Sequence, residues 1–262
     1  MRVDGHRTAL PTARAGLAPD VGLYDAVHRR RDVRGEFTGR PMPAGVLERI
    51  LGAAHAAPSV GLTQPWDFVV VEDPVLRRSF YDHVQEERAV FAGSLPGPEA
   101  ARFADIKIEG ILEATSSVVV TYDPDRGAPH VLGRHAIADA GLYSVCLAIE
   151  NLWLASTAEG MGMGWVSFYR EEFLARLVGL PERVRPVAWL CLGPVTHLEE
   201  VPDLERHGWR RRVPLASVVH YDRWDRSERG DRTGRGERTG RGARTAGWGR
   251  TPLGVADDGG PR

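Results

Sequence analysis

The stretch AGLYSVCLAIENLWLASTA (140–158), followed by EGMGMGWVSF (159–168), is the part of the chain that best defines the fold. A lipid-facing helix does not tolerate acidic or amide side chains in its middle, so the first stretch predicts a helix buried in a protein core. The apolar residues Trp165–Phe168 then predict a buried strand. The polar interruptions of this long apolar region are Asp139, Glu150 and Asn151.

Outward from this stretch, short apolar segments alternate with helical patterns. One helix is predicted after Pro43, because apolar residues then recur at helical spacing as far as Ala54. Further helices are predicted from Pro74 toward Val90 and around Arg102–Glu113. This alternation indicates an α+β fold in which helices pack on one sheet, and it leaves the strand order open. The other predicted strands are Phe68–Val71, Val118–Tyr122, Val187–Leu192 and Val218–His220.

The composition is that of an ordinary globular protein. The 262 residues carry a formal net charge of −1, which provides no general attraction to nucleic acid or acidic lipid. Cys146 and Cys191 belong to no CxxC motif or Cys/His cluster, so neither a structural zinc site nor a disulfide framework is expected. No apolar secretory segment follows the first arginines, and we expect a cytoplasmic protein. Among the 34 Lys and Arg residues Lys107 is the one lysine, a bias typical of a GC-rich coding sequence.

Three regions of the chain differ in composition. Residues 1–20 mix Arg, Pro, Gly and Ala without periodicity, which predicts a flexible N-terminal segment. Residues 21–225 are the expected folded domain. Residues 226–262 are rich in Gly and regularly spaced Arg, and we predict a disordered tail because they cannot bury enough apolar surface. An RGG-like arm that binds nucleic acid is the alternative, but one aromatic residue and several acids weaken it.

The first candidate site is RRRDVR (29–34). Guanidinium groups are always charged and offer forked donors that match phosphate oxygens, so this segment predicts an anion site. The alternative is a solvated helix end. Asp32 lies among these cations and is expected to stay ionised unless a bound ligand desolvates it.

The second candidate site is APSVGLTQPW (57–66), which follows a predicted helix and precedes a predicted strand. Pro58 must end the helix, which leaves backbone N–H groups and the Ser59 hydroxyl available to a polar ligand edge. A plain connecting loop is the alternative.

Two further segments complete the set. The glycines of GMGMGWVS (160–167) lie between a helix and a strand, whereas a dinucleotide-binding loop runs from strand to helix. We therefore predict a turn that lets the backbone approach a flat ligand and places Ser167 at the far end of the strand. The segment GWRRRVPL (208–215) is a second arginine cluster, which could close on the same anion.

Taken in this order, these segments resemble the FMN-dependent nitroreductase-like flavoproteins and, within them, the 5,6-dimethylbenzimidazole synthase branch. The resemblance covers roughly residues 24–215. It implies an α+β fold with a mainly antiparallel central sheet packed by helices, and a homodimer with flavin sites between the subunits. The segments that carry it are RRRDVRGEF (29–37), AAPSVGLTQPWDFV (56–69), IKIEGI (106–111), NLWLASTAEGMGMGWVSFY (151–169), VAWLCLG (187–193) and GWRRRVPL (208–215).

The resemblance also implies roles for individual residues. Asp32 and Ser167 would be catalytic, Ser59 would reach the flavin from the facing subunit, and residues around 86–110 would form a lid. No metal site is implied. The flavin-binding set would be Arg30, Arg31, Asp32, Val33, Arg34, Pro58, Ser59, Gly164, Trp165, Ser167, Arg210 and Arg212.

The reaction that this branch implies consumes the flavin. Reduced FMN and dioxygen would be converted to 5,6-dimethylbenzimidazole, the lower ligand of cobalamin, and erythrose 4-phosphate, with a separate flavin reductase supplying reduced FMN. The alternative on the same fold is an NAD(P)H-dependent FMN nitroreductase or flavin reductase, because a fold does not decide its chemistry. A third possibility is a binding protein that acts through its Arg/Gly-rich tail. Membrane and nucleic-acid partners are not expected.

Overall fold

The computed structural model describes residues 22–224, so the predictions for the N-terminal segment and for the tail lie outside the described residues. Residues 22–212 belong to one compact unit and residues 213–224 to a second. The first unit contains α1 Leu23–Arg29, α2 Val46–His55, η1 Val60–Leu62, β1 Phe68–Val71, α3 Pro74–Gly93, α4 Gly97–Ala104, β2 Ser116–Tyr122, α5 Ala140–Ala158, β3 Met161–Val166, α6 Glu171–Leu177, β4 Arg185–Pro194 and α7 Asp203–Arg206. The second contains η2 Leu215–Ser217.

A single antiparallel sheet organises the first unit. Its strand order is β1-β2-β4-β3, and each neighbouring pair is antiparallel, with Val118 opposite Leu190 in the central pair. The predicted α+β class with helices packed on one antiparallel sheet is therefore confirmed.

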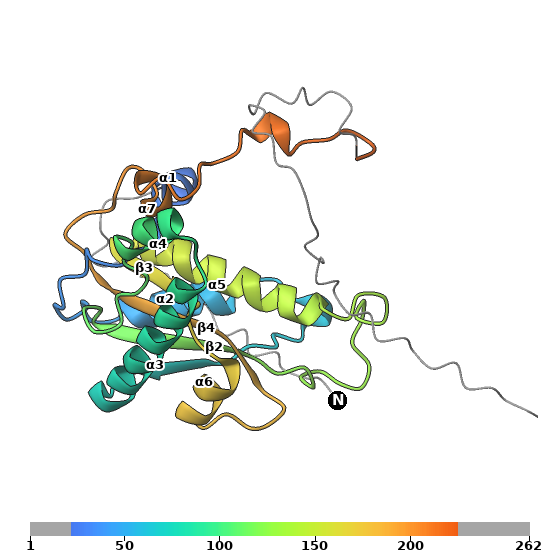
Figure 1. Cartoon of the computed structure of the whole chain (residues 1–262). Helices are drawn as coiled ribbons and strands as arrows, with labels where there is room; N and C mark the ends of the chain where they lie inside the picture. The colour runs from blue at the N-terminus through green and yellow to red at the C-terminus, as the bar shows by residue number, and fades with distance from the viewer. Residues whose placement is uncertain (1–21, 225–262) are drawn as a thin grey trace, which may run out of the picture. The chain divides into compact units, whose positions relative to one another are not determined.

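Helices cover both faces of this sheet (Figure 1). Side chains alternate between the faces along a strand, so Val118 and Val120 of β2 pack in the core with α2 and α5, while Val119 packs in the opposite core with α3 and α6. On that second face Trp189 stacks on Phe80, with 3.8 Å between the ring centroids. The predicted burial of the 140–158 helix is confirmed, because one side of α5 lies in the first core.

Three predicted elements differ from the structure. The strand expected at Trp165–Phe168 is β3, which begins at Met161, so the glycine-rich segment is mostly strand and only Gly160 makes the turn, with φ 74°. The helix expected around Arg102–Glu113 is wrong beyond Ala104, because α4 spans Gly97–Ala104 and residues 106–110 are irregular. The segment Val218–His220 is not a strand, because no strand of the sheet pairs with it.

Candidate functional site

The arginine-rich segment runs alongside β3. The Val33 N–H donates to the Met163 carbonyl at 2.9 Å, and Asp32 forms a parallel bridge with Met163. A Cβ added at Gly164 would lie 2.1 Å from the Val33 carbonyl oxygen, a distance that real Cβ atoms do not reach. The predicted turn is therefore wrong at this position, since Gly164 lies within β3, where its missing side chain leaves room for the backbone of Val33. Both residues are buried, and contact of Gly164 with a flavin stays a prediction.

The Asp32 carboxylate is held at the end of β3. Its Oδ1 accepts from the Trp165 N–H at 2.9 Å, and its Oδ2 accepts from Arg34 Nη2 at 2.5 Å. Arg34 also donates to the Trp165 carbonyl at 2.7 Å. Burial raises the pKa of Asp32, an effect that the Arg34 guanidinium and the Trp165 N–H offset only in part. The side chain is still 47% accessible, because it faces a cavity.

That cavity has a volume of about 300 Å³. It brings together four of the residues that the sequence predicts for the site: Asp32, Arg34, Trp165 and Ser167. Ser167 lies one residue beyond β3 and is exposed in the cavity wall. Ile106, Lys107 and Ile108, from the region expected to form a lid, and Phe168 add to the wall. The rest comes from a segment that the sequence did not single out for the site: Pro202, Asp203 and Leu204.

A cluster of cations adjoins this cavity. The Arg30 guanidinium lies 4.6 Å from the centre of the Trp153 ring and 3.8 Å from a Glu150 oxygen. Burial lowers the pKa of Arg31, and the charges of Arg212 and Arg30 lower it further, so Arg212 of the second arginine cluster is close enough to Arg31 for their charges to interact.

Arg31 is only partly satisfied by protein groups. Its guanidinium donates to the carbonyls of His28, Arg30 and Glu200, yet its Nε is buried and has no hydrogen-bond partner among residues 22–224. A buried donor without a partner is costly, and like charges held together repel. An anion bound here would relieve both, so the cluster fits a phosphate-like group.

Other predicted residues lie elsewhere. Pro58 and Ser59 are not part of the cavity wall within the described chain, and the Ser59 hydroxyl oxygen accepts from the Gln64 N–H at 2.9 Å. Arg210 is exposed, and its backbone N–H donates to the Leu204 carbonyl at 3.2 Å.

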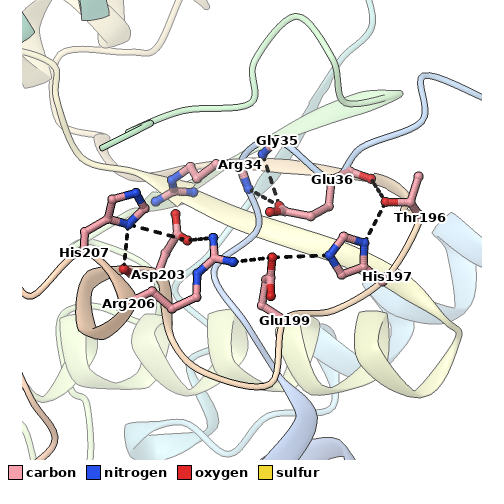
Figure 2. A network of polar contacts seen from close by, with 9 residues as sticks. All are labelled: Arg34, Gly35, Glu36, Thr196, His197, Glu199, Asp203, Arg206 and His207. Carbon is pink, nitrogen blue, oxygen red and sulfur yellow. Dashed lines mark hydrogen bonds and ion pairs between the residues drawn. The ribbon is translucent and has the colours of Figure 1, made fainter. Parts of the chain in front are cut away.

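A polar network that the sequence reasoning missed leads from Arg34 to α7 (Figure 2). The N–H groups of Arg34 and Gly35 donate to Glu36, each at 3.1 Å. At the other end Arg206 donates to Asp203 and to Glu199, each at 2.6 Å. The network thus connects two residues of the cavity wall, Arg34 and Asp203. Thr196, His197 and His207 complete it. The spacing of Asp203, Arg206 and His207 by three and four residues is the one signal in the sequence that could have indicated it.

Between residues 22 and 224 no three His, Cys, Asp or Glu side chains are grouped so as to hold a metal ion. No helix in the same range is long and apolar enough to span a membrane.

The comparisons with known proteins agree with this architecture. The nitroreductase family model matches residues 27–194. A 5,6-dimethylbenzimidazole synthase of Rhodospirillum rubrum is 36% identical over 75% of this chain and 93% of its own, and one of Rhodobacter capsulatus is 34% identical over 73% and 92%. The crystal structure of an oxidised iodotyrosine deiodinase bound to FMN and 3-iodo-L-tyrosine superposes with a TM-score of 0.61 at 23% identity, covering 78% of this chain and 100% of that one. The chain belongs to the nitroreductase family.

Proposed function

We propose that this protein converts reduced FMN and dioxygen to 5,6-dimethylbenzimidazole and erythrose 4-phosphate, with the flavin consumed as substrate. One observation carries the proposal: a single cavity holds Asp32 and Ser167, next to an arginine cluster suited to a phosphate. The two synthases that this chain resembles over nearly their whole length support the same reaction.

The described residues fit FMN as a ligand. The unpartnered Nε of Arg31 and the charges of Arg30 and Arg212 would hold its phosphate, with Arg210 close by in sequence. Ile106, Ile108, Trp165 and Phe168 give the cavity apolar walls, which suit a flat ring and keep water away from it.

Bound reduced FMN would supply both the electrons for dioxygen and the atoms of the benzimidazole. The protein would supply proton transfer and orientation. Asp32 is fixed by Arg34 and Trp165, and burial makes its carboxylate a better proton acceptor than an exposed one, so it can take up and return a proton at its cavity face. Ser167 can donate a hydrogen bond from the same cavity.

The resemblance to the two synthases favours a separate source of reduced FMN, because a flavin that is consumed must be supplied already reduced for each turnover. We therefore assign the supply of electrons to a separate flavin reductase, working in the cytoplasm on soluble FMN.

We also propose that the protein is a homodimer. Tyr143, Cys146 and Leu147 form an exposed, largely apolar stripe on α5, and Leu23 and Tyr24 are exposed on the adjacent α1. Exposed apolar side chains gathered on neighbouring helices are typical of an interface. Pro58 and Ser59 would then complete the flavin site of the facing subunit, in agreement with their absence from this cavity wall.

The experiment mixes the protein anaerobically with excess photoreduced FMN, admits air, and measures 5,6-dimethylbenzimidazole by mass spectrometry. We expect product well above a protein-free control, and its loss in Asp32→Asn and Ser167→Gly. Asp82→Asn is the matched control, because Asp82 also faces an arginine, Arg78 at 4.0 Å, but on the exposed surface of α3.

Formation of product at the wild-type rate by Asp32→Asn, with FMN bound, would remove the role given to Asp32. Wild-type protein that forms no product, and instead cycles bound FMN between NAD(P)H and a nitroaromatic, would establish the reductase alternative.

A further inference from the structure

Lys107 combines two unusual properties. It is the one lysine among 34 Lys and Arg residues, and it lies in the wall of the candidate cavity. Its neighbours Ile106 and Ile108 line the same cavity, so the irregular segment between α4 and β2 presents a cation between two apolar side chains.

The contacts of Lys107 leave donors available. Its ammonium donates to Glu113 Oε1, and its side chain remains 38% accessible. An ammonium carries three donor hydrogens, and Glu113 is its one hydrogen-bond partner among residues 22–224. The remaining donors can therefore reach a ligand in the cavity.

The position of the Lys107 stem brings it to the arginine-rich segment. A Cβ added at Gly35 would lie 3.9 Å from Lys107 Cδ, so the stem runs past the backbone that follows Arg34. Four separate segments thus contribute polar groups to one cavity: residues 32–34, the end of β3 with Ser167, Lys107, and Asp203 of α7.

The choice of lysine at this position is informative. A chain that uses arginine at all its other basic positions would satisfy a simple need for charge with arginine. A guanidinium is a broad planar fork, whereas an ammonium is a compact point charge that fits where the fork does not. When a ring fills the cavity, the space that remains fits a compact ammonium better than a guanidinium.

We propose that the Lys107 ammonium contacts the flavin in this cavity directly, as a ligand-binding residue for which arginine is no substitute. The inference rests on the proposed function for the identity of the ligand. Glu113 then holds the ammonium in place from the side away from the flavin.

The test uses the single lysine. Apart from the α-amino group, Lys107 is the one primary amine in the sequence, so acetylation by an N-hydroxysuccinimide ester, followed by peptide mass spectrometry, reports on it alone. Under anaerobic conditions we expect photoreduced FMN to slow acetylation of Lys107 at least tenfold. An unchanged rate at FMN concentrations that saturate binding by fluorescence would overturn the proposal.

Three variants separate ligand contact from a structural ion pair. We expect Lys107→Met and Lys107→Arg to weaken FMN binding about tenfold, and Glu113→Gln, which breaks the ion pair but keeps the amine, to weaken it less than threefold. Equal losses in Lys107→Met and Glu113→Gln, or wild-type affinity in Lys107→Arg, would contradict the proposal. If wild-type protein forms no benzimidazole although FMN protects Lys107, the proposed reaction fails and the contact stands.

Discussion

Replacement of Gly164 by alanine tests how the site is assembled. The added Cβ would lie 2.1 Å from the Val33 carbonyl oxygen and 2.4 Å from Arg34 Nη1. Because the nearest obstacle is the backbone of Val33 and not the end of a side chain, the segment that carries Asp32 must move away from β3. Overpacking of this kind costs about 1–3 kcal/mol. Loss of the Val33–Met163 hydrogen bond adds about 0.5–1.5 kcal/mol, so we expect a total of roughly 2–4 kcal/mol.

Thermal denaturation followed by circular dichroism measures this effect. For a domain of this size each kcal/mol lowers the Tm by about 2–4 °C, so Gly164→Ala should unfold roughly 5–15 °C earlier and bind FMN weakly. Gly52→Ala is the matched control, because Gly52 lies inside α2 with no atom within 4 Å of the added Cβ. It should gain about 0.5–1 kcal/mol from a better helix former. Wild-type Tm and FMN affinity in Gly164→Ala would refute the packing of this segment on β3.

Three further predictions concern the interface, a buried acid and the arginine cluster. Leu147→Glu should convert the proposed dimer to a monomer, as measured by analytical ultracentrifugation; a wild-type sedimentation coefficient would place the interface elsewhere. Burial raises the pKa of Glu109, with help from the charge of Glu113, so the native state holds its proton to higher pH than the unfolded chain. Denaturant titrations should therefore show wild-type stability falling relative to Glu109→Gln as pH rises above about 4.3, and parallel curves would contradict this. Arg212→Ala should bind FMN about tenfold more weakly, or 1.4 kcal/mol, without loss of Tm; unchanged affinity would separate Arg212 from the site.

Local patterns in the sequence predicted the regular elements well. The strand Phe68–Val71 and the helix Ala140–Ala158 have the predicted bounds, because each is a continuous apolar or helical pattern bordered by polar or turn-forming residues. The order β1-β2-β4-β3 could not be predicted, since it depends on pairing between segments far apart in the chain.

The candidate site was predictable only where chemistry marks a residue. Asp32 is an acid among arginines, and Ser167 follows a glycine-rich strand, so both drew attention. Asp203 did not, because α7 has four residues and no apolar periodicity. The sequence predicted a helix that includes Lys107, but α4 ends at Ala104. The approach of Lys107 to the cavity follows from tertiary packing. The meaning of Gly164 likewise required the structure, since the backbone that it admits lies about 130 residues away in sequence.

The proposed reaction consumes the flavin and does not merely oxidise it. The visible absorbance of FMN, followed after air is admitted to photoreduced FMN and protein, distinguishes the two. We expect this absorbance to recover incompletely, with a deficit equal to the 5,6-dimethylbenzimidazole formed and absent in Asp32→Asn. Full recovery of the FMN absorbance with wild-type protein would contradict it.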